Sequence, residues 1–178
     1  NKLKNFKVIK KINSEIIIFK MSYFSDDRGD FLKLFSSKDL DRYFDGKIKQ
    51  INFVKNKTKG IFRGFHYQTK KYAEQKLVTC LKGKVEVIII NCKKKSKNYL
   101  KSYKFFLSEK NNFFLLVPEN YAHGYFVMEN KTEVLYFSNK DYNFSHEKIM
   151  NPYDPILKIN WKNKKLILSD KDKTSKFI

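Results

Sequence analysis

A chain of 178 residues with 42% hydrophobic residues is long enough for a domain with a real core, and its composition is not that of a disordered protein. The formal charge of +20 comes almost entirely from lysines spread along the chain, and no nucleic-acid-binding motif accompanies them, so we do not predict a nucleic-acid-binding protein. No apolar run approaches the roughly 20 residues that cross a bilayer, and the N-terminal stretch lacks a signal-peptide pattern. We expect a cytoplasmic protein without a membrane partner, with Cys80 and Cys92 as reduced structural thiols.

Short apolar runs, many of which alternate with polar residues, predict a series of β-strands. They span residues 15–20, 30–35, 49–54, 76–83, 84–91, 101–107, 113–118, 124–128 and 132–138. Residues 36–44 predict a helix, because a serine opens the segment, Asp39 lies in its first turn and Gly46 follows its end. Gly83, between two strands, predicts a tight hairpin. Many short strands with little helix are typical of an all-β sandwich or barrel, here a single domain over residues 1–178.

Three stretches hold most of the few arginines and histidines, each beside a glycine. They are SDDRGDF at 25–31 with Arg28, GIFRGFHYQ at 60–68 with Arg63 and His66, and VPENYAHGYF at 117–126 with His123. Each residue alone is more often an ordinary hydrogen-bonded side chain, but together they indicate a functional site. In a regular strand Arg63 and His66 would point to opposite faces, because three steps reverse the direction of the side chain. Both can face one pocket if the strand bends or bulges, and we expect this at Gly64.

Six motifs in the same order resemble the nucleotide-sugar 3,5-epimerase family. They are D-[DE]-R-G-x-F, G-x-x-R-G-x-H-[YF]-Q, K-L-V at 76–78, P-x-x-[FY]-A-H-G-[FY] at 118–125, E-x-L-Y at 133–136 and L-S-x-K-D at 168–172. The best-known members act on dTDP-4-keto-6-deoxyglucose. The resemblance implies a cupin-type jelly roll with a few short helices, a homodimer, and catalysis without a metal or an organic cofactor. Gly64 stands where the H-x-H pair of a metal-binding cupin would need a second histidine, which also predicts that no catalytic metal is bound.

The resemblance also implies four catalytic residues. Epimerisation beside a ketone requires a base, and His66 matches the family's base. Asp172 would hold and tune that imidazole, with Asp170 as the alternative if the motif register shifts by two residues. Lys76 would stabilise the enolate oxygen, and Tyr136 matches the proton donor on the opposite face of the sugar.

A second group of residues is expected to bind the substrate, a nucleotide-diphospho-sugar. Arg28 and Arg63 are expected to bind the diphosphate, and Gln50 and Asn52 lie on one strand face. The other members are His123, Tyr142 and Lys33. Lys33 stands where rhamnose-pathway members usually carry an acidic residue. PENYAHGY replaces the usual P-x-G-F-A-H-G-F, and Tyr142 is flanked by Asp141 and Asn143 where the family often has YYSP. These departures leave open a dTDP-hexose or a GDP-linked keto-heptose, and inversion at C3 alone or at C3 and C5.

Three other functions remain as alternatives. A 3,4-ketoisomerase on the same scaffold would move the carbonyl instead of inverting a centre. A non-catalytic cupin would bind a sugar, although the complete set of His66, Lys76, Tyr136 and Asp172 argues against it. A basic nucleic-acid-binding barrel would need aromatic and basic residues grouped on one face, and the sequence does not group them.

Overall fold

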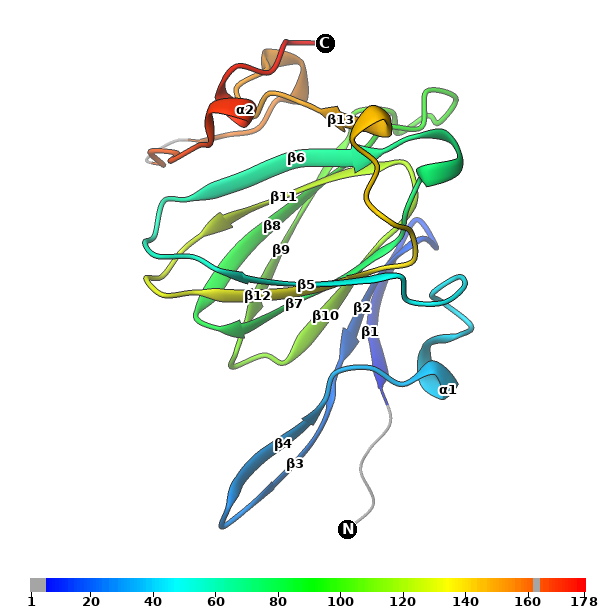
Figure 1. Cartoon of the computed structure of the whole chain (residues 1–178), viewed down its shortest axis with the longest axis vertical. Helices are drawn as coiled ribbons and strands as arrows, with labels where there is room; N and C mark the ends of the chain where they lie inside the picture. Colours follow the sequence, from blue (N-terminus) through cyan, green and yellow to red (C-terminus); the bar gives the residue numbers. More distant parts are fainter. Residues whose placement is uncertain (1–5, 162–163) are drawn as a thin grey trace.

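In the computed structural model, which describes residues 6–161 and 164–178, two antiparallel sheets face each other (Figure 1). The first sheet has the strand order β1 (Lys7–Ile12), β2 (Ile16–Lys20), β10 (Phe113–Val117), β7 (Lys76–Lys82), β12 (Glu133–Ser138), β5 (Gln50–Lys55). The second has the order β13 (Glu147–Ile149), β6 (Phe62–Gln68), β11 (Tyr121–Val127), β8 (Lys84–Asn91), β9 (Ser102–Ser108). The prediction of an all-β jelly roll is confirmed.

The remaining elements are small. β3 (Ser22–Asp26) and β4 (Gly29–Lys33) pair only with each other, and their hairpin projects away from the body of the molecule (Figure 1). The helices of the described residues are all short: α1 (Ser37–Leu40), α2 (Asp170–Lys173), and the 3₁₀ turns η1 (Lys70–Tyr72), η2 (Phe144–His146) and η3 (Pro155–Leu157). None of them is long and apolar enough to cross a membrane.

Alternation along the strands divides the apolar side chains among three clusters. On β8, Val87 and Ile89 join the cluster between the sheets, whereas Ile88 and Ile90 face the other way. The outer face of the first sheet is covered by the segment around α1, and the outer face of the second sheet by the chain that follows β13. The C-terminal segment therefore lies against β6, where it can supply residues to a site between the sheets.

Two local predictions are wrong. The helix expected over 36–44 is a single turn, because the chain turns after Leu40 so that Phe44 is buried in the cluster on the outer face of the first sheet. Gly83 is not in a hairpin: β7 and β8 belong to different sheets, and Gly83 is the corner where the chain crosses between them. Its φ is +74°, and a Cβ there would lie 2.4 Å from Oγ1 of Thr132. Cys80 and Cys92 are both free thiols, as expected.

Candidate functional site

A cavity of about 450 Å³ lies between the two sheets. β6 and β11 form one wall, β5, β7 and β12 form the other, and residues 167–169 and 172 contribute from the C-terminal segment. A second lobe of about 290 Å³ shares His66, Lys76 and Tyr136 with the first, so the two are parts of one cleft. The polar residues of the larger lobe are Arg63, His66, Lys76, His123, Tyr125, Tyr136, Ser169 and Asp172.

A bulge in β6 turns both Arg63 and His66 toward this cavity. His66 pairs with His123 and Arg63 pairs with Tyr125, so three steps on β6 oppose two steps on β11. Gly64 lies within the bulge with φ +135°, and its peptide bond to Phe65 is cis. A Cβ on Gly64 would lie 2.5 Å from Cα of Gly124. The predicted bulge at Gly64 is confirmed, and close approach of the two strands requires a glycine on each.

His66 is held by a buried carboxylate. Its Nε2 lies 2.5 Å from Oδ1 of Asp172, which is 3% exposed and lies in α2. Burial opposes ionisation of Asp172, but hydrogen bonds from His66 and from its surroundings outweigh it, so its pKa lies below the usual range. Because an ionised carboxylate only accepts, Nε2 carries a proton, and Nδ1 faces the cleft beside a second carboxylate. Asp170, the alternative partner, is exposed.

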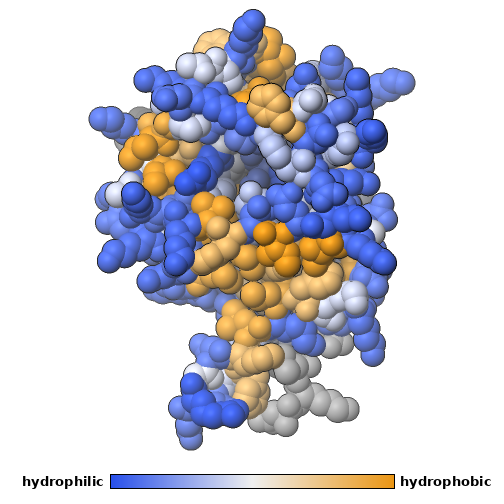
Figure 2. Space-filling view, viewed as in Figure 1, coloured by the Kyte–Doolittle hydropathy of each residue, from blue (hydrophilic) through white to orange (hydrophobic). Residues whose placement is uncertain are grey.

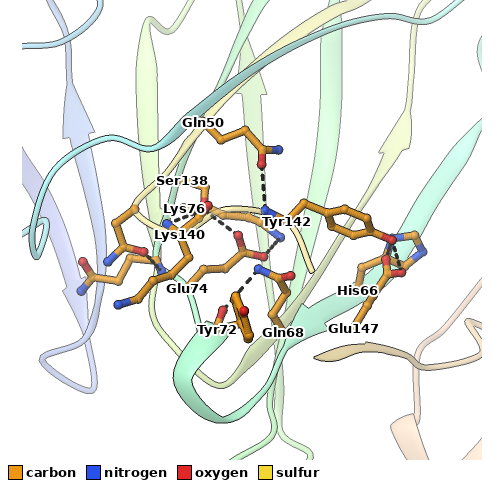
Figure 3. A network of polar contacts seen from close by, with 12 residues as sticks. Gln50, His66, Gln68, Tyr72, Glu74, Lys76, Ser138, Lys140, Tyr142 and Glu147 are labelled. Carbon is orange, nitrogen blue, oxygen red and sulfur yellow. Dashed lines mark hydrogen bonds and ion pairs between the residues drawn. The ribbon is translucent and has the colours of Figure 1, made fainter. Parts of the chain in front are cut away.

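Glu147 is a second carboxylate beside the imidazole, and it was not predicted from the sequence. Its Oε1 lies 3.3 Å from Nδ1 of His66, and its Oε2 accepts from the Tyr142 hydroxyl at 2.8 Å (Figure 3). The same Oε2 accepts from Lys171 at 2.5 Å. Burial opposes ionisation of Glu147, yet these donors lower its pKa. Lys171 was also missed, although it lies inside the L-S-x-K-D motif.

Lys76 is oriented by a neighbouring acid (Figure 3). Its Nζ lies 2.8 Å from Oε1 of Glu74, and the other oxygen of Glu74 accepts from the Ser138 hydroxyl at 2.5 Å. Both ends of the ion pair are largely buried, so the ammonium is fixed in direction at the junction of the two lobes. Tyr136 lines the same junction from β12, and burial raises the pKa of its phenol, as do Glu74 and Glu147.

His123 lies deep in the cavity opposite His66. It is buried, and its Nε2 has no hydrogen-bond partner among the described residues. Burial lowers the pKa of His123 to about 3, and the positive charge of Lys76 adds to the shift. His123 is therefore a neutral imidazole at ordinary pH, able to accept or donate one hydrogen bond to a ligand.

The other predicted binding residues divide into those at the cleft and those away from it. Gln50 and Asn52 share one face of β5, as predicted, and Gln50 accepts from the backbone N–H of Tyr142 at 3.1 Å. Gln50 and Tyr142 line the smaller lobe. Asn52, between Gln50 and the cavity-lining Val54 on that face, has a buried Nδ2 without a partner in the described chain.

Arg28 and Lys33 lie outside the cleft of their own chain. Arg28 is at the tip of the β3–β4 hairpin with 88% of its side chain exposed, and it pairs with Asp26 at 2.6 Å. Lys33 lies at the end of β4 in the same hairpin. Neither lines either lobe of the cleft, because the hairpin leaves the body of the molecule.

Within residues 6–161 and 164–178, no group of three or more His, Cys, Asp or Glu side chains is placed to hold a metal ion.

The family is decided by comparison with known proteins. The family profile of dTDP-4-dehydrorhamnose 3,5-epimerase matches residues 11–178. The enzyme of that name from Shigella flexneri is 35% identical over 167 residues, which cover 93% of this chain and 92% of the relative.

The chain belongs to the dTDP-4-dehydrorhamnose 3,5-epimerase family.

Solved structures of the family have the same fold. The dTDP-4-dehydrorhamnose 3,5-epimerase from Bacillus anthracis, with TDP and PPi bound, superposes with a TM-score of 0.92 at 29% identity, covering 97% of this chain and 99% of that one. The enzyme from Legionella pneumophila, in complex with dTDP-4-keto-L-rhamnose, gives a TM-score of 0.90 at 27% identity, covering 97% and 93%. The resemblance inferred from the six motifs is confirmed, and the chain is an epimerase of the isomerase class.

Proposed function

We propose that this epimerase inverts C3 and C5 of a dTDP-4-keto-6-deoxy sugar, the reaction that its relatives' names describe. The observation that carries the proposal is the position of His66 and Tyr136. His66 comes from β6 and Tyr136 from β12, in opposite sheets, and both line the same cleft. A base and an acid on opposite walls are what inversion requires, since the proton leaves one face of the sugar and returns to the other.

Proton removal is assigned to His66. Asp172 accepts from Nε2–H and stabilises the imidazolium that forms, so Nδ1 is the nitrogen that takes the proton. Glu147 occupies the neighbourhood of Nδ1 at 3.3 Å, a longer contact than that of Asp172. The reacting carbon must therefore approach Nδ1 in competition with Glu147.

Stabilisation of the negative charge that develops on the ketone oxygen is assigned to Lys76. Glu74 fixes the direction of the ammonium at the junction of the lobes, so little reorganisation is needed when the enolate forms. Proton return is assigned to Tyr136. Its raised pKa keeps the phenol protonated, and therefore able to donate, at ordinary pH.

A homodimer is proposed from the surface around β5 and the hairpin. β5 ends the first sheet, and its outward side chains Ile51 and Phe53 are exposed, as are Tyr23 and Phe31 of the hairpin. Figure 2 shows an apolar band that runs from the body of the molecule onto the hairpin. A second copy that covers this band would pair an open strand edge and would let the hairpin carry Arg28 toward the partner's cleft.

The dimer is tested by light scattering of the purified protein and of an Ile51→Glu variant. A dimer in the wild type and a monomer in the variant are expected. Phe106→Glu, at a similarly exposed phenylalanine on β9, is the matched control and leaves the dimer intact. A wild-type monomer would contradict the proposal.

We also place the protein in the cytoplasm, because its two unpaired cysteines suit a reducing compartment.

The reaction is tested by incubation with dTDP-4-keto-6-deoxyglucose in D2O and NMR of the product. Deuterium at both C3 and C5, with inverted stereochemistry, is expected, and a GDP-linked keto-heptose serves as the comparison substrate. Deuterium at C3 alone would restrict the proposal to one centre. A shifted carbonyl would indicate a 3,4-ketoisomerase instead, and the absence of exchange would contradict an epimerase.

A further inference from the structure

Tyr125 places a second phenol in the catalytic cavity. It lies on β11 two residues after His123, so both side chains point to the same face, and their ring centroids are 6.2 Å apart. Tyr125 is 3% exposed and lines the larger lobe.

The hydroxyl of Tyr125 is buried and has no hydrogen bond to any described residue. Asn56 is near it, close enough to favour the phenolate slightly, but not in hydrogen-bond geometry. Burial raises the pKa of Tyr125 to about 12, and neither the positive charge of Arg63 nor Asn56 offsets it. The phenol therefore keeps its proton and can act as a donor.

The nearby side chains of Arg63 and Asn56 form hydrogen bonds with other groups. Arg63 has only donors, and its Nε donates to Oδ1 of Asn56 at 2.9 Å. Asn56 in turn donates through Nδ2 to the carbonyl oxygen of Thr132 at 3.1 Å, and its backbone N–H donates to the same oxygen at 2.8 Å. This arrangement fixes the guanidinium, and the Tyr125 hydroxyl has no hydrogen-bond partner among the described residues. A buried donor of this kind carries a desolvation cost that a ligand oxygen would relieve.

We propose that the Tyr125 hydroxyl donates a hydrogen bond to an oxygen of the bound sugar, an inference that rests on the proposed function. Tyr125 shares its lobe with His66, Lys76 and Tyr136, which are assigned to the chemistry, and also with Arg63, which is expected on the diphosphate. We assign its hydroxyl to the sugar, and a Kd for dTDP alone that rises in Tyr125→Phe would overturn that assignment. Tyr125 is then a substrate-binding residue that selects for an acceptor oxygen on the sugar.

The experiment compares Tyr125→Phe with Tyr121→Phe by isothermal titration of two ligands. Tyr121 lies on the same strand with the same exposure, but its hydroxyl already donates to Glu15 at 2.9 Å and it does not line the cleft. The ligands are dTDP and dTDP-glucose, which has no ketone and is not turned over. For Tyr125→Phe we expect an unchanged Kd for dTDP and a Kd for dTDP-glucose that rises about 5- to 30-fold. For Tyr121→Phe we expect both constants to be unchanged.

Thermal unfolding of the ligand-free proteins provides a second readout. Because the Tyr125 hydroxyl has no partner, Tyr125→Phe is expected to have a Tm no lower than that of the wild type, whereas Tyr121→Phe loses its bond to Glu15 and has a lower Tm. An unchanged Kd for dTDP-glucose in Tyr125→Phe, or a clearly lowered Tm, would overturn the inference and leave the proposed function intact. A wild-type protein that binds neither ligand would overturn the proposed function, and this inference with it.

Discussion

Replacement of Asp172 by asparagine tests how much the buried carboxylate contributes to His66. The carboxylate lies 2.5 Å from Nε2, so when His66 takes a proton the two charge centres are about 4 Å apart. At an effective dielectric constant of about 20, this pair is worth about 4 kcal/mol, which corresponds to about 10³-fold in rate. The amide can also donate to Nε2, which moves the ring proton to Nδ1 and removes the base. We therefore expect kcat to fall by about 10³-fold or more.

The assay is the initial rate of epimerisation followed by NMR, with circular dichroism as a check that Asp172→Asn is folded. Asp170→Asn is the matched control, because Asp170 is in the same short helix but exposed, and it is expected to keep wild-type kcat. A folded Asp172→Asn variant with kcat within ten-fold of the wild type would refute the assigned role.

Three further predictions concern the bulge, acid stability and proton return. Gly64→Ala should destabilise the protein by about 3 kcal/mol or more in denaturant titrations, because its Cβ would meet Gly124 at 2.5 Å; Gly46→Ala, with a positive φ but open space, should cost about 1 kcal/mol. The pKa of His123 is about 3 in the folded protein against an ordinary value of 6.5, so below about pH 6.5 the unfolded chain binds a proton that the folded protein does not. The free energy of unfolding should therefore be highest above about pH 6.5 and fall by up to about 1.4 kcal/mol per pH unit below it. In His123→Asn this decrease with falling pH should be smaller. Tyr136→Phe should slow proton return by about 10²-fold or leave one centre uninverted, as judged by NMR of the product; an unchanged rate and product would exclude the role.

The strands that could be predicted are those whose side chains alternate or are buried on both faces. Residues 84–91 form β8 as expected, since both faces of that strand are covered. β1 was missed because it is an edge strand with mostly exposed lysines, which gives no apolar pattern. The Gly83 error has a similar origin, because two strands adjacent in sequence pair in a hairpin or separate into different sheets according to contacts far away in the chain.

Within the site, the sequence identified residues whose types are rare in this chain. Arg63, His66 and His123 stand out among the lysines, and all three line the cavity. Glu74 and Glu147 could not be found in that way, because their role depends on which side chains the fold brings to Lys76 and His66. The sequence also could not show that the hairpin with Arg28 leaves the body of its own chain.

The most direct test of the central claim is the rate at which solvent deuterium enters C3 of dTDP-4-keto-6-deoxyglucose with wild-type protein and with His66→Asn. We expect rapid exchange with the wild type and a rate at least 10²-fold lower with the variant, while dTDP binding and Tm remain close to those of the wild type. Exchange at the wild-type rate in a folded His66→Asn variant would contradict the account, because another group would then be removing the proton.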